Sequence, residues 1–197
     1  MEAPLNDPET DPRESAESLM CRYVAGDTAA FKRLYSELSP RLFGYLLRLT
    51  RHKERAEDLV QITFTKVHRA KDSYLIGAPI LPWILAIARR SFYDERRHAK
   101  VRPEDLSYDG SLPEPTAHEA ALGSDMAEAL ELAFRRLPTA YAEAIQLTKI
   151  TGLSVAEASE VLGTSRTAVK LRVHRGYLLL RQELEHFSRN HETSLAD

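Results

Sequence analysis

The side chains best suited to chemistry are basic and hydroxyl groups clustered between Val161 and Gln182. This stretch holds five Lys and Arg residues and no acidic residue. At helical spacing, the polar groups expected on one outward face are Arg166, Thr167, Lys170 and His174, flanked by Arg172 and Arg175. A guanidinium can bond a guanine edge with two hydrogen bonds, and an ammonium can reach guanine or phosphate. The pattern therefore favours contact with duplex DNA.

Local signals around this cluster predict a helix-turn-helix. Ser154 followed by Glu157 is the pattern of a capping box, which fixes a helix start. Gly163 can adopt the positive φ of a turn, and Ser165 can cap the second helix. The inward stripe expected on that helix is Val169, Val173, Gly176 and Leu180. The alternative, a plain helical hairpin with a solvated basic face, explains fewer of these features.

A second basic surface is expected between Pro82 and Arg102. From Lys66 to Arg102 there are nine Lys and Arg residues against three acidic ones. One exposed side of the predicted helix carries Arg89, Tyr93, Arg96, Arg97 and Lys100, and the inward side carries Ile84, Ile87 and Ala88. Cations interleaved with a ring suit a single nucleic-acid strand, because phosphates pair with cations and bases stack on rings. Trp83 is a stacking candidate but more often a core residue, and Tyr74 is expected to be exposed in a loop.

A third polar face recurs on the helix predicted between residues 53 and 70. Asp58, Gln61, Thr65 and His68 follow helical spacing, opposite the apolar positions Val60, Phe64 and Val67. Taken from the residues alone, this face is best explained as the hydrated side of a core helix.

The elements that position these surfaces predict an all-α protein with two small helical domains joined by a flexible linker. The expected order is a disordered tail (1–15), an N-terminal helical bundle (16–102), an acidic Pro-rich linker (103–124), a C-terminal helix-turn-helix domain (125–188) and a frayed tail (189–197). A break is expected at Gly26-Asp27. Pro40 is expected in the first turn of a helix, or at a bend.

Several function classes are disfavoured. Cys21 is the single cysteine, so neither a disulfide nor a thiolate metal site is expected. The seven histidines lack ligand spacing, and no Gly-rich phosphate loop or nucleophile triad occurs, so we expect no metal, no cofactor and no enzyme. No apolar run approaches 18 residues, and the acidic start is unlike a secretory signal, so we expect a cytoplasmic protein without membrane insertion.

Taken together, these segments resemble the extracytoplasmic-function (ECF) sigma factors of the sigma-70 superfamily, over about residues 18–184. The motifs that carry the resemblance are Asp58-Leu59-Val60-Gln61 followed by Phe64, the run Pro82 to Arg89, and Leu137 to Gly176. The resemblance implies an alternative sigma factor that binds the RNA polymerase core and directs promoter-specific initiation. It also implies control by an anti-sigma factor. The acidic linker is hypothesised to run near the template-strand channel.

The resemblance assigns three sets of residues. The set for the duplex minus-35 element is Ser165, Arg166, Thr167, Lys170, Leu171, Arg172, His174 and Arg175. The set for the single-stranded minus-10 element is Tyr74, Trp83, Arg89, Arg90, Tyr93, Arg96 and Arg97. The set for the polymerase is Asp58, Gln61, Ile62 and Thr65, which would grip the clamp helices of the largest subunit, with a further contact at the flap.

This sequence departs from the family pattern at several of these positions. Ile62 stands where an acidic residue is usual, Leu171 where a small Ser is frequent, and Arg90 where Asn is common. The alternative interpretation is a helix-turn-helix regulator that acts on DNA without binding the polymerase core. Co-purification with core polymerase distinguishes the two.

Overall fold

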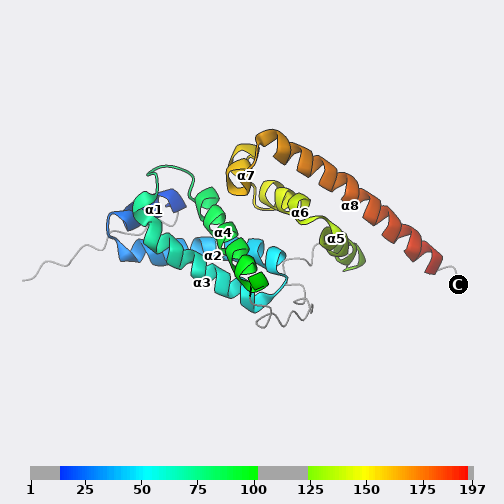
Figure 1. The fold of residues 1–197 in the computed structure, drawn as a ribbon, viewed down its shortest axis with the longest axis horizontal. Helices are drawn as coiled ribbons and strands as arrows, with labels where there is room; N and C mark the ends of the chain where they lie inside the picture. Colours follow the sequence, from blue (N-terminus) through cyan, green and yellow to red (C-terminus); the bar gives the residue numbers. More distant parts are fainter. Residues whose placement is uncertain (1–13, 102–123, 195–197) are drawn as a thin grey trace, which may run out of the picture.

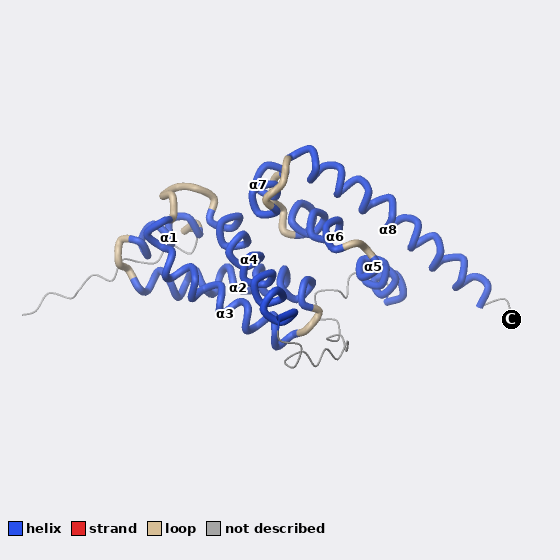
Figure 2. The backbone as a smooth tube through the Cα atoms, viewed as in Figure 1, coloured by secondary structure: helices blue, strands red, loops and turns tan. Residues whose placement is uncertain are grey.

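The computed structural model describes residues 14–101 and 124–194, and these two ranges consist of helices joined by short loops, without strands, as expected (Figures 1 and 2). The elements are α1 (Ala16–Val24), α2 (Thr28–Thr50), α3 (Lys53–Ala70), the 3-10 turn η1 (Lys71–Ser73), α4 (Ile80–Val101), α5 (Ser124–Arg136), α6 (Thr139–Ile145), the π-helical turn η3 (Gln146–Ile150), α7 (Val155–Leu162) and α8 (Arg166–Ser194). No helix among the described residues combines the length and the apolarity that a membrane span requires. The expected linker lies mostly outside the described residues.

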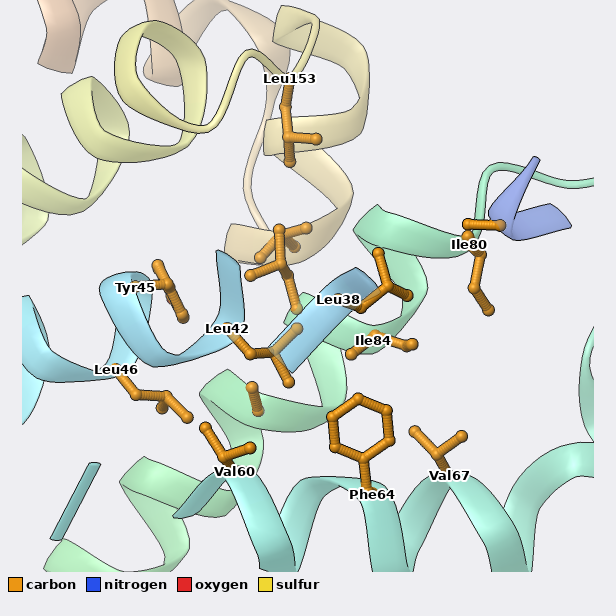
Figure 3. Packing of buried hydrophobic residues seen from close by; sticks show 14 of the residues in the cluster. Leu38, Leu42, Tyr45, Leu46, Val60, Phe64, Val67, Ile80, Ile84 and Leu153 are labelled. Carbon is orange, nitrogen blue, oxygen red and sulfur yellow. The ribbon is translucent and has the colours of Figure 1, made fainter. Parts of the chain in front are cut away.

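Helices α1 to α4 form the N-terminal bundle around a shared apolar core. Leu42 from α2, Phe64 from α3 and Ile84 from α4 point toward one another in this core (Figure 3). Asp27 is the N-cap of α2, because its side chain accepts hydrogen bonds from the backbone N–H groups of Ala29 and Ala30. The predicted break at Gly26-Asp27 is therefore confirmed.

Two boundaries in this domain differ from the expectation. Pro40 does not lie in the first turn of a helix, because α2 continues through it from Thr28 to Thr50, and the alternative expectation of a bend at Pro40 stays a prediction. The ordered domain also begins before residue 16. Ser15 caps α1, and the Glu14 carboxylate pairs with Arg22 at 2.9 Å and Arg33 at 2.8 Å. These ion pairs tie Glu14 to α1 and α2.

Helices α5 to α8 form the C-terminal domain, and its predicted helix-turn-helix is confirmed. Ser154 and Glu157 make both hydrogen bonds of a capping box at the start of α7. Gly163 ends α7 with φ 61°, and the Ser165 hydroxyl accepts from the N–H of Ala168 to cap α8. Helix α8 continues to Ser194, so the frayed tail predicted after residue 188 is helical for most of its length.

The two domains pack directly against each other. Their buried residues form one continuous apolar cluster, in which Leu147, Leu153 and Val161 of the C-terminal domain join the core of the bundle. Figure 3 shows Leu153 approaching α2 and α4 from the C-terminal domain. A closed arrangement of this kind was not part of the sequence prediction, which treated the domains as two separate modules.

Candidate nucleic-acid interfaces

The candidate DNA-contacting surface of the helix-turn-helix lies at the start of α8 and on its first three turns. Of the residues assigned to the minus-35 element, Arg172 is half-buried and the others are exposed: Ser165, Arg166, Thr167, Lys170, Leu171, His174 and Arg175. Within residues 14–101 and 124–194, none of the basic side chains in this set makes an ion pair. These cations are therefore available to a polyanion.

The scaffold behind this surface is tightly packed. Val169 is fully buried, and Val173 packs against both apolar clusters. Gly176 and Leu180 complete the inward stripe that the sequence predicted. Burial on one side fixes the rotation of α8, so its basic side must face outward.

The second basic surface, on α4, is only partly as expected. Arg90, Arg96 and Arg97 are exposed, with Arg97 paired to Asp94 and the Arg96 guanidinium 5.6 Å from the centre of the Phe92 ring. Arg89 and Tyr93 are instead half-buried. The sequence placed both on the exposed side, and that prediction is wrong because the C-terminal domain covers them.

A carboxylate from α6 holds these two covered residues. Glu143 accepts hydrogen bonds from the Arg89 guanidinium at 3.2 and 3.4 Å and from the Tyr93 hydroxyl at 3.1 Å. The Arg89 guanidinium also lies over the Tyr93 ring, 4.6 Å from its centre. Burial, together with the negative charge of Glu143, raises the pKa of Tyr93. Tyr93 is therefore a neutral hydrogen-bond donor here.

The loop before α4 corrects another expectation. Tyr74 is buried, with 5% of its surface exposed, and does not lie at the surface. Its ring packs against that of Trp83, with 5.3 Å between the ring centres, and its hydroxyl donates a hydrogen bond to the carbonyl of Ala78. Burial raises the pKa of Tyr74 to about 12. Trp83 itself is half-buried against the core, so it matches the core alternative more than the stacking one.

The side chains that this loop presents outward are Leu75 and Ile76. They are 76% and 66% exposed, the two highest values among the large exposed apolar side chains of the described residues. The loop is anchored on both sides, since Tyr74 is buried and the Glu17 carboxylate accepts from the N–H of Ile80. Sequence reasoning missed this pair. The available signal was two large apolar residues between breakers, just before Gly77.

The candidate polymerase surface lies on α3 (Figure 1). Asp58, Gln61, Ile62 and Thr65 are all exposed along one side of this helix, and Ile62 is 43% exposed. Val60, Phe64 and Val67 are buried beneath them, as the spacing predicted. The geometry brings the four residues together.

The fold and these surfaces define a two-domain helical protein with a helix-turn-helix module of the DNA-binding kind. Two family models match it, Sigma-70 region 2 over residues 34–102 and Sigma-70 region 4 over residues 127–180. Each match falls on one of the two domains.

Known proteins resemble the chain along most of its length. It is 34% identical over 170 residues to the RNA polymerase sigma factor CarQ of Myxococcus xanthus, a match covering 84% of this chain and 95% of CarQ. It is 32% identical over 181 residues to the ECF RNA polymerase sigma factor SigF of Caulobacter vibrioides, covering 89% and 97% of the two chains. The chain belongs to the ECF family of RNA polymerase sigma factors.

A solved structure supports the same assignment. The sigma factor RpoE from Bartonella quintana, crystallised in complex with the anti-sigma factor NepR, superposes with a TM-score of 0.65 and 29% sequence identity. The match covers 79% of this chain and 96% of RpoE. Its architecture is therefore that of a sigma factor in both domains.

Proposed function

We propose that this chain binds the RNA polymerase core and directs it to promoters, with its two basic surfaces contacting two promoter elements. The observation that carries the proposal is the exposed cationic face at the start of α8, within a capped helix-turn-helix, whose basic side chains make no ion pair with the residues that the structure describes. Family membership identifies RNA polymerase as the partner. The positions of the surfaces assign one promoter element to each domain and the polymerase contact to α3.

The C-terminal domain would dock on the duplex minus-35 element. The N-terminal half of α8 carries Arg166 and Lys170 where a recognition helix meets base edges. Arg172 and Arg175 flank them and suit phosphates, which position a protein without reading sequence. Leu171 is 44% exposed on the same helix and suits an apolar contact such as a thymine methyl group.

The N-terminal domain would hold the opened minus-10 strand. Arg90, Arg96 and Arg97 supply cations for its phosphates, and the exposed loop pair Leu75 and Ile76 supplies an apolar surface for an unpaired base. In this proposal Tyr74 and Trp83 act by anchoring the loop from beneath, rather than by touching DNA.

The polymerase would be bound chiefly through α3, with Asp58, Gln61, Ile62 and Thr65 against the clamp helices of the largest subunit. The flap would meet the C-terminal domain. An anti-sigma factor is a further expected partner, and the complex of the similar sigma factor RpoE with NepR supports it. A cytoplasmic location goes with these partners.

Reconstituted transcription tests the proposal against a regulator that acts without polymerase. Core polymerase, the purified chain and fragmented genomic DNA are combined, and transcript 5′ ends are mapped. The proposal expects discrete new start sites that share two sequence elements. Stable binding of the chain to DNA, with no association with core polymerase and no new start sites, would support the regulator instead.

A further inference from the structure

The interface between the domains contains a buried carboxylate with partners on the opposite domain. The Glu143 side chain is 3% exposed. Beyond Arg89 and Tyr93 of α4, it lies 3.4 Å from the hydroxyl of Tyr45 on α2, which donates to it. A charged group so far from water is stable only when paired and hydrogen-bonded. All three of these partners belong to the N-terminal domain, so separation of the domains removes them together.

A second buried polar side chain also forms hydrogen bonds from the C-terminal domain to the N-terminal domain. The Gln146 amide nitrogen donates to the backbone carbonyls of Gly44 at 3.3 Å and Tyr45 at 3.2 Å. Gln146 is 2% exposed and begins the π-helical turn η3, one turn after Glu143. Turns of this type are rare and are frequent at functional sites. Two neighbouring side chains of the C-terminal domain, Glu143 and Gln146, thus form hydrogen bonds with the N-terminal domain. Glu143 bonds to side chains of α2 and α4, and Gln146 bonds to backbone carbonyls of α2.

Contacts at the rim of the interface are more exposed. The Arg51 guanidinium donates to the carbonyl of Arg135 at 2.8 Å, and Arg48 pairs with Glu131 at 3.5 Å. Exposed contacts of this kind add little stability and weaken in salt. The buried pair Glu143 and Gln146 therefore carries the directional part of the contact.

We propose that Glu143 and Gln146 form a latch that holds the chain closed and withholds Arg89 and Tyr93 from nucleic acid. The Glu143 carboxylate pairs with the Arg89 guanidinium in the way that a DNA phosphate would, so a DNA strand must displace this carboxylate to bind Arg89. When the domains separate, Glu143 becomes hydrated and both partners on α4 become exposed. Closure itself does not depend on the proposed function, whereas the consequence for DNA binding rests on it.

The latch is tested on the full chain with Glu143→Gln, Gln146→Leu and the two combined. The first removes the charge with little change of shape, and the second removes the crossing amide without a change of charge. Glu128→Gln is the matched control, because Glu128 is exposed on α5 of the same domain and the charge change is identical. Circular dichroism identifies which variants are folded, and Gln146→Leu decides the question if variants at Glu143 do not fold.

Small-angle X-ray scattering measures closure directly. The radius of gyration is expected to rise in each latch variant, most in the combined one, and to stay at the wild-type value in Glu128→Gln. An unchanged radius in the folded latch variants would overturn the latch. An equal rise in the control would also overturn it, because the effect would then be one of general charge.

Binding of a fluorescent single-stranded 12-mer separates the latch from the proposed function. Since affinity scales with the fraction of open molecules, the combined variant is expected to bind about tenfold more tightly than the wild type if about a tenth of the wild type is open. Expansion without tighter binding leaves the latch standing and contradicts the role of α4 in strand capture. Tighter binding without expansion contradicts the latch.

Discussion

Gly176 of α8 lies directly against Ile145 of α6. A Cβ atom built on Gly176 would stand 2.6 Å from the Ile145 Cδ1, closer than side-chain carbons approach each other. Alanine at position 176 would therefore displace the Ile145 side chain, and its Cβ would also stand 3.3 Å from the Tyr141 Cβ. The contact sets the position of the recognition surface one to three turns earlier on the same helix.

Gly176→Ala is expected to destabilise the chain by up to about 2 kcal/mol. Alanine favours a helix over glycine by about 1 kcal/mol, but overpacking costs about 1–3 kcal/mol and prevails here. Urea denaturation gives the difference. Pairing the change with Ile145→Val, which removes the crowding methyl, is expected to recover part of the loss. Full stability of Gly176→Ala alone would mean that α6 and α8 are not packed this closely.

Arg166→Ala and Lys170→Ala are expected to weaken promoter binding by about 1–3 kcal/mol each if they read bases. Each should also relax preference at one position of the minus-35 element. Arg175→Ala should instead weaken binding equally on all sequences and reduce its salt dependence. Fluorescence anisotropy on duplexes with single base changes measures both quantities.

Arg181→Ala is the control for these variants, because Arg181 is exposed further along α8 and pairs with Glu185. Binding is expected to be close to wild type. A loss as large as that of Arg166→Ala would assign the effect to overall charge rather than to the reading surface.

Leu75→Ser combined with Ile76→Ser is expected to impair promoter opening while leaving stability within about 0.5 kcal/mol, because both side chains are largely exposed. Permanganate footprinting of the opened region reports the effect. Leu178→Ser on α8, which is 50% exposed, is the matched control for loss of a surface apolar group. Normal opening by the double variant would remove the loop from the proposed strand surface.

Alkaline pH is expected to destabilise the fold through its buried tyrosines. Because the folded-state pKa of Tyr74 is raised to about 12, its contribution is complete below pH 10 and is lost as the pH rises from 10 toward 12. At 1.36 kcal/mol per pKa unit, this loss approaches about 3 kcal/mol. Urea denaturation at pH 9, 10 and 11 measures the slope.

Tyr74→Phe is expected to be less stable than wild type by about 1 kcal/mol at pH 7, since it loses the bond to Ala78. Its decline above pH 10 should be shallower. Some loss of stability above pH 10 should remain in this variant, because the pKa of Tyr45 is also raised. The main cause there is burial, and the negative charge of Glu143 adds to it. An identical slope in both proteins would show that Tyr74 ionises freely in the folded state.

Local features of the fold could be predicted from the sequence, because their signals lie within a few residues. The capping box at Ser154, the turn at Gly163 and the bounds of α3 are examples. What could not be predicted depends on distant partners. In the sequence, Glu143 cannot be told from an exposed carboxylate on a helix, because its partners lie on α4, far away in the chain. Tyr74 likewise cannot be told from an exposed tyrosine of a loop, because its burial depends on Trp83. The positions assigned for contact with polymerase and promoter remain predictions.

The central claim is that the chain gives RNA polymerase its choice of promoter, and in vitro transcription tests it most directly. Core polymerase is supplied with wild-type chain or with the Arg166→Ala/Lys170→Ala variant on a template carrying a mapped promoter. The account predicts a specific transcript that requires the chain and falls at least tenfold with the variant. A transcript independent of the chain, or equally strong with the variant, would contradict it.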